Sequence, residues 1–229
     1  MAQQRGQTVL RRPEVAFILI AYVWSWVWWV PMAVQGVTTR AGQTWPTHLP
    51  GLLGPAVAAV VVTAAVSGRA GLADLGLRIV RVRVGWVWYA VLAVTAGVGA
   101  GAIALQGMLG RGWPTAAELS TYSGAATMPW IVLVVLVLVV NGFGEEIGWR
   151  GFLVQRWAPG RSLLRTSLLV AAVWVPWHLP LFWVSESLRS FGPGGASGWL
   201  VSITAGSVVL TWMYLGSGGS IWIAALWHT

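Results

Sequence analysis

Residues 131–150 read IVLVVLVLVVNGFGEEIGWR, an apolar run that ends in two adjacent acids and an arginine four residues after the second acid. A helix that crosses the hydrocarbon core of a bilayer needs about 20 largely apolar residues, and this stretch has that length. Ionisable groups at membrane depth are costly, so they usually face a cavity or one another. The stretch therefore predicts a membrane helix with Glu145 and Glu146 inside the protein.

The composition of the whole chain agrees with a membrane protein. Of its 229 residues, 57% are hydrophobic and only 9% are charged, whereas a soluble domain carries about 25% charged residues. So few charged side chains exclude an ordinary soluble domain, a disordered chain and a fibrous repeat. The chain has no cysteine, which excludes disulfides and thiolate metal sites.

The apolar runs predict an all-α fold: a polytopic transmembrane helical bundle of about seven spans, forming one membrane-embedded domain over residues 1–229. A cleaved signal peptide is the alternative for the first run, but its length and aromatic residues favour a retained span. The last run is too short to cross a membrane, so we favour a sequence that is a fragment. The expected spans are 15–34, 50–66, 84–109, 128–149, 163–184, 199–215 and an incomplete one from about 220.

Three segments carry further expectations. The arginine-rich residues 69–83 are expected to form an amphipathic segment at the membrane interface. The glycines at 97, 99 and 101 are expected to permit close helix packing. The glycine-rich stretches 192–198 and 216–219 are expected to be turns between helices.

The arginines predict a multi-pass protein of the cell membrane with its N-terminus in the cytoplasm. The net charge of +8 comes from arginines placed between apolar runs, which suits topology signals better than a nucleic-acid interface, so we expect no nucleic-acid partner. With the N-terminus inside, only Arg40, Arg111 and Arg189 lie outside. The inside arginines are Arg5, Arg11, Arg12, Arg69, Arg78, Arg81, Arg83, Arg150, Arg156, Arg161 and Arg165.

The two acids of the opening stretch have different helical neighbours. Glu146 and Arg150 are four residues apart and can neutralise each other. Glu145 has no such partner, and it shares a helix face with Asn141 and Trp149. An unpaired buried carboxylate is a candidate general base. The plainer alternative is a salt bridge at a helix end.

Two histidines lie at depths comparable with that of Glu145. His178 follows Trp174 by one helical turn, near two prolines, and His228 lies in the last apolar run. The rise per residue of an α-helix, counted from the predicted helix ends, places Glu145, His178 and His228 in the inner half of the membrane. It does not say which way each side chain faces. Each histidine alone could be structural, and His48, in an outer loop, is interpreted as structural.

The pattern Glu145-Glu146-Ile-Gly-Trp-Arg150, then Trp174 to His178, then His228, resembles the CPBP family over residues 129–229. That family includes the type II CAAX prenyl endopeptidases and related bacteriocin-immunity proteins. The resemblance implies that Glu145 activates a water molecule, that His178 assists and that His228 stabilises the oxyanion. Glu146, Arg150, Asn141 and Trp174 would shape the site.

Two departures from the family pattern stand out. The second motif usually begins with phenylalanine, where this chain has Trp174, and a polar residue usually follows the last histidine by four positions, beyond Thr229. The family has also been called metalloproteases, and zinc could be held by Glu145, His178 and His228. Because His-Glu-x-x-His is absent and a carboxylate base needs no metal, we expect no obligatory metal or other cofactor.

The leading hypothesis is therefore an intramembrane endopeptidase that cleaves a membrane-associated or lipidated peptide near the cytoplasmic face, with membrane lipid as its surroundings. The alternative is a non-catalytic membrane immunity or partner protein that retains the same fold. A proton-coupled carrier is a third possibility, which the absence of an obvious internal repeat disfavours. The sequence alone identifies neither the natural substrate nor the oligomeric state.

Overall fold

The structure is a computed structural model that describes residues 12–229. Arg5 and Arg11, assigned to the cytoplasm above, lie outside these residues. The described residues form helices and links without a β-strand, joined at three places by isolated bridges. The predicted all-α class is confirmed.

Five of the described helical segments are long and apolar enough to cross a membrane. They are α1 (Pro13–Val34), α2 with α3 (Leu49–Leu52, Gly54–Ile79), α4 (Trp86–Met108), a composite helix (Trp130–Trp157) and α11 (Pro193–Gly216). The fifth predicted span, 163–184, is shorter in the structure, where α8 is Leu163–Trp177, and α12 (Ile221–His228) has the short length expected of the seventh. The count of seven spans stays a prediction.

The composite helix is built from five consecutive pieces. These are α5 (Trp130–Val137), the π-helical turn η2 (Leu138–Phe143), α6 (Gly144–Gly148), the π-helical turn η3 (Trp149–Val154) and α7 (Gln155–Trp157). It continues eight residues beyond the predicted end at 149. Arg150 is consequently fully buried inside the bundle rather than placed in a cytoplasmic loop, which corrects its assignment as a topology signal.

Gly68 breaks the helical geometry of α3, with φ +57° and ψ −151°. Positive φ is accessible to glycine at little cost, so the chain can turn at this point. The residues after Gly68 are helical and pack Leu75 and Arg78 into the bundle. The predicted segment at 69–83 is thus the second arm of α3, and its location at a membrane interface stays a prediction.

The link between α8 and α11 is irregular. After His178 come two short helices, α9 (Leu181–Val184) and α10 (Glu186–Arg189). The predicted turn at 192–198 is wrong for most of its length, because α11 begins at Pro193, a residue whose fixed φ suits the first helical turn. The turn expected after α11 is confirmed, since residues 217–220 connect it to α12. The short 3₁₀ helix η1 (Glu118–Ser120) lies in the link after α4.

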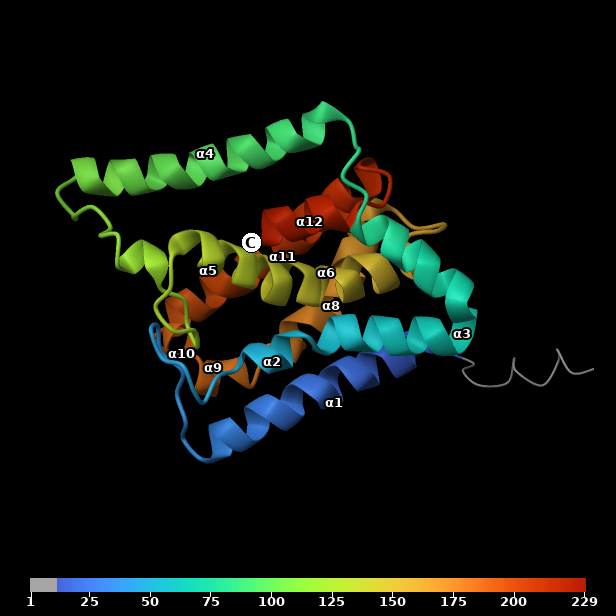
Figure 1. The fold of residues 1–229 in the computed structure, drawn as a ribbon, viewed down its shortest axis with the longest axis horizontal. Coiled ribbons are helices and arrows are strands. Elements are labelled where there is room, and N and C mark those ends of the chain that lie inside the picture. The colour runs from blue at the N-terminus through green and yellow to red at the C-terminus, as the bar shows by residue number, and fades with distance from the viewer. Residues whose placement is uncertain (1–11) are drawn as a thin grey trace, which may run out of the picture.

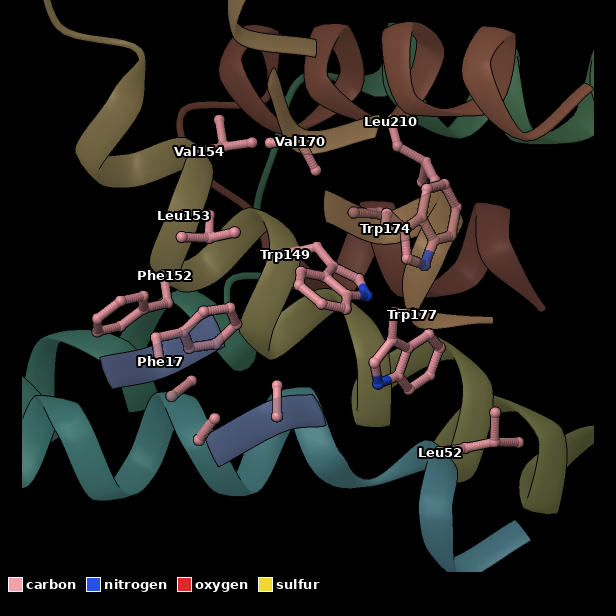
Figure 2. Close-up of a cluster of buried hydrophobic side chains, with 14 of the residues drawn as sticks. Phe17, Leu52, Trp149, Phe152, Leu153, Val154, Val170, Trp174, Trp177 and Leu210 are labelled. Carbon is pink, nitrogen blue, oxygen red and sulfur yellow. The ribbon is translucent and has the colours of Figure 1, made fainter. Parts of the chain in front are cut away.

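Aromatic side chains fill the centre of the bundle (Figure 2). Phe17 of α1 stacks on Phe152 of η3 at 4.7 Å between ring centroids. Trp177 of α8 packs edge-on against Trp29 at 4.8 Å and Trp149 at 5.6 Å. These contacts tie α1 and α8 to the composite helix, so it lies in the middle of the fold.

Helix α4 lies apart from that core, along one side of the bundle (Figure 1). None of its residues is buried by the part of the chain that the structure describes. The expected close packing at Gly97, Gly99 and Gly101 is therefore wrong for this structure, because no described atom lies within 4 Å of a Cβ built at any of them.

Candidate active site

Glycines let the composite helix approach its neighbours closely around the two acids. A Cβ built on Gly148 would lie 2.5 Å from Cβ of Pro55 and 2.6 Å from its carbonyl oxygen. A Cβ on Gly142 would lie 2.8 Å from the carbonyl oxygen of Ala225 in α12. The π-helical turns on both sides of α6 are of a kind often found at functional sites. Together they hold Glu145 and Glu146 against α3 and α12.

Glu145 is buried, with 1% of its surface exposed. Its Oε2 accepts hydrogen bonds from the indole nitrogens of Trp174 at 2.6 Å and Trp149 at 3.3 Å. Its Oε1 lies 4.0 Å from Nε2 of His228 and accepts no hydrogen bond from any described residue. One oxygen is thus fixed by the protein and the other is available to a small molecule such as water.

Glu146 makes the predicted pair with Arg150 and also holds His228. Its Oε1 accepts from Nη1 of Arg150 at 2.8 Å and lies 2.7 Å from Nδ1 of His228. A carboxylate only accepts hydrogen bonds, so Nδ1 carries the proton of this contact. Glu146 thereby fixes the imidazole orientation and turns Nε2 toward Glu145.

Arg150 connects the two acids through an aromatic ring. Its Cζ lies 4.7 Å from the centroid of the Trp174 ring, a cation–π contact, while the same indole donates to Glu145. Loss of Arg150 would therefore disturb both Glu146 and the donor to Glu145.

His178 caps the C-terminal end of α8, where Pro176 and Pro180 interrupt helical hydrogen bonding. Its Nδ1 lies 2.8 Å from the carbonyl oxygen of Trp174, so Nδ1 carries a proton and Nε2 remains as an acceptor in the neutral ring. The ring packs against Trp177 at 4.7 Å between centroids, which limits its rotation.

Glu145, His178 and His228 line one cavity of about 440 Å³. The predicted convergence of one acid and two imidazoles is thus seen in the geometry, from α6, the end of α8 and the end of α12. Uncharged polar side chains cover much of the remaining wall. The lining also includes Ala41, His48, Leu52, Thr121, Tyr122, Ser123, Asn141, Leu181, Ser185, Ser187 and Leu188.

Of these further lining residues only Asn141 was a predicted site residue, and two of the others, Tyr122 and His48, make side-chain hydrogen bonds near the acids or in the wall. Tyr122 donates from its hydroxyl to Oδ1 of Asn141 at 2.9 Å, which leaves the amide NH₂ of Asn141 as a donor. His48 lies 2.9 Å from the hydroxyl of Thr39, and burial lowers its pKa to about 4. His48 had only its position between two prolines as a signal, and nothing in the sequence marked Tyr122.

One oxygen of each acid is engaged by protein groups. Among residues 12–229, no group of three or more His, Asp or Glu side chains is spaced to hold one. Glu145 gives Oε2 to two indoles, and Glu146 gives Oε1 to Arg150 and His228.

The position of the cavity bears on two topology expectations. Its wall includes residues from the links that follow α1, α4 and α8, which lie at the end of the bundle opposite the start of α1. The orientation of the N-terminus and the membrane face to which the cavity opens both stay predictions.

A buried acid beside two imidazoles, within apolar helices, is an arrangement suited to hydrolysis at membrane depth. Residues 127–229 match the family model described as type II CAAX prenyl endopeptidase Rce1-like. The chain is also similar to CAAX prenyl protease 2 of Methanococcus maripaludis, with 31% identity over 102 residues that cover 42% of this chain. The matched segment spans 37% of that relative's length. The family resemblance expected from the motifs is confirmed.

Proposed function

We propose that this chain is an intramembrane endopeptidase of the CAAX prenyl protease type, in which Glu145 activates the attacking water. The observation that carries the proposal is the unequal treatment of the two oxygens of Glu145. Two indoles hold Oε2, while Oε1 faces Nε2 of His228 across 4.0 Å. A water in that space would lie within reach of both groups.

The proposed reaction uses Glu145 first as a base and then as an acid. Oε1 takes a proton from the water, and the resulting hydroxide attacks the carbonyl carbon of the peptide bond. The C–N bond of the tetrahedral intermediate then breaks, and the protonated Glu145 gives its proton to the leaving nitrogen. Water is consumed, and a carboxylic acid and an amine are produced, which become a carboxylate and an ammonium ion by proton transfer, without a covalent enzyme intermediate.

The other lining residues position the water and the oxyanion. His178 presents an unprotonated Nε2 to the cavity and would accept a hydrogen bond from the water. The oxyanion needs donors, which the amide of Asn141 and Nε2 of His228, when protonated, would supply. Asn141 is thus a candidate for the donor role that the family usually gives to a residue after the last histidine.

The matched test is Glu145→Gln against Glu118→Gln, both purified in detergent with a quenched lipidated peptide as substrate. Glutamine keeps the shape of the side chain but removes the base, so we expect a loss of about 10²–10⁴-fold in cleavage rate. Glu118 is exposed and outside the cavity, so its variant should match the wild type. Equal rates for Glu145→Gln and wild type would end the proposal.

A chelator arm in the same assay addresses metal dependence. We expect full activity after treatment with a strong zinc chelator, because the proposed base and donors are protein groups. Activity that is lost on chelation and restored by zinc would overturn the metal-free mechanism.

The second candidate, a non-catalytic immunity or partner protein, is favoured by one observation. The buried contacts of Glu146 with Arg150 and His228 join the composite helix to α12, so the same residues serve stability. Under that alternative, Glu145→Gln would leave the cellular phenotype of the protein intact, and purified wild type would show no cleavage above the variant.

A further inference from the structure

The two ends of the bundle differ in charge. The arginine-rich end comprises the start of α1, the second arm of α3 with the link to α4, and α7 with the link to α8. Each end carries two acids, so the difference comes from the arginines. The opposite end has Arg40, Arg111 and Arg189. Besides the buried Arg78, the arginine-rich end has Arg12, Arg69, Arg81, Arg83, Arg156, Arg161 and Arg165.

The cavity that holds Glu145 is lined from the arginine-poor end. The three links at that end are joined to one another by isolated bridges, Thr39 with Ser185 and Ala41 with Ser123, and Ala41, Ser123 and Ser185 line the cavity. Arg40 and Glu186 add an exposed ion pair between two of these links at 3.2 Å. Among the described residues, no side chain from the arginine-rich links lines the cavity.

A buried hydrogen-bond network around Arg78 joins the helices at the arginine-rich end. The buried Arg78 donates to the carbonyl oxygen of Gly151 at 2.7 Å and to the hydroxyl of Tyr214 at 2.9 Å, and it pairs with Asp74 at 2.8 Å. Tyr214 donates onward to Gln155 at 3.0 Å. This network joins α3, the composite helix and α11 through residues that are not part of the cavity lining.

We infer that the cavity opens at the non-cytoplasmic face of the membrane, and that it receives a polypeptide segment from that side. Short arginine-rich links stay in the cytoplasm by the positive-inside rule, which places the arginine-poor end and the cavity mouth on the other face. The substrate is then an exported polypeptide or the outer juxtamembrane part of a membrane protein. The peptide nature of the ligand rests on the proposed function, whereas the orientation does not.

The absence of cysteine from the chain makes the orientation directly measurable. Single cysteines are introduced at the arginine-poor end as Ser187→Cys and Ala116→Cys, and at the arginine-rich end as Val82→Cys and Pro159→Cys. All four positions are exposed and leave every arginine in place. Spheroplasts of a bacterial host that express the full chain are treated with a membrane-impermeant maleimide, before and after permeabilisation.

We expect Ser187→Cys and Ala116→Cys to react equally before and after permeabilisation. Val82→Cys and Pro159→Cys should react only after it. The reverse pattern would overturn the inference, and so would reaction of all four sites before permeabilisation, which would mean that the chain has no single orientation.

A second arm separates this inference from the proposed function. A charged-tagged, quenched peptide that cannot cross a bilayer is added to spheroplasts and, separately, to inverted vesicles. We expect Glu145-dependent cleavage in spheroplasts and a loss of at least tenfold in inverted vesicles. Cleavage in inverted vesicles alone would contradict the inferred orientation of the cavity but not the proposed hydrolysis. Equal rates for wild type and Glu145→Gln in detergent would contradict the proposed hydrolysis but not the orientation measured by labelling.

Discussion

Helix α4 and the composite helix are both apolar and both contain several glycines, yet the structure uses them differently. A Cβ at Gly99 of α4 would meet no described atom within 4 Å, whereas one at Gly148 would overlap Pro55. The composite helix carries the acids and the π-helical turns, while α4 lies along the outside (Figure 1). Apolar length therefore predicts a membrane helix, and close backbone approach together with buried charge marks the functional one.

The largest expected effect comes from Arg150→Met, compared with Arg111→Met just beyond α4. Arg150 is fully buried and pairs with Glu146, so its removal leaves an uncompensated carboxylate, at a cost of about 3–5 kcal/mol. Arg111 is exposed, and its loss should change stability by less than about 0.5 kcal/mol. Denaturant unfolding in detergent micelles measures both. Equal stability of the two variants would show that Glu146 finds another partner.

Trp174→Phe tests the donor to Glu145. The matched control is Trp227→Phe, in α12, whose indole contacts α4. The indole of Trp174 donates to Glu145 at 2.6 Å, and hydrogen bonds to charged groups contribute about 1.5–3 kcal/mol. We expect the cleavage rate to fall between about 10- and 100-fold with the fold retained. Trp227 donates to Thr95 of α4 at 3.3 Å, and its variant should keep wild-type activity. An unchanged rate for Trp174→Phe would mean that this donor has no part in positioning the base.

The smallest effect is expected for Gly148→Ala, with Gly99→Ala as its control. This pair tests most directly the comparison between the composite helix and α4. The added methyl at 148 must displace Pro55, which costs about 1–3 kcal/mol. At 99 the same change meets open space and should be neutral or stabilise the helix by up to about 1 kcal/mol. Thermal unfolding in micelles reports both. Destabilisation by the change at 99 would indicate that α4 packs closely against a partner outside this chain.

Much of the fold follows from residue types alone, because apolar length and periodicity are local properties. The pair of Glu146 with Arg150 was predictable, since four residues on a helix fix the neighbourhood. The partners of Glu145 across helices were not, because rise per residue gives depth but not direction. The contact of His228 with Glu146 and the bond from Tyr122 to Asn141 depend on how distant segments pack.

Arginine was the most misleading residue type. Counting treats every arginine as a marker of the cytoplasmic end, but Arg78 and Arg150 are buried and hydrogen-bonded within the bundle. Only packing separates such arginines from exposed ones such as Arg81 and Arg161. For the same reason, an arginine does not reliably mark the end of a membrane helix. When it is paired, as Arg150 is with Glu146, the helix can continue past it.

The two indole donors make the oxygens of Glu145 chemically distinct. A free carboxylate can rotate and exchange its oxygens, but Trp149 and Trp174 both hold Oε2, so rotation would break two hydrogen bonds at once. Any proton that arrives on Oε1 must leave from the same atom, toward the same side of the carboxyl plane. In the proposed mechanism, a substrate with the opposite orientation of its scissile bond would have no acid within reach of its leaving group, so two tryptophan side chains would set the direction in which a polypeptide passes this carboxylate.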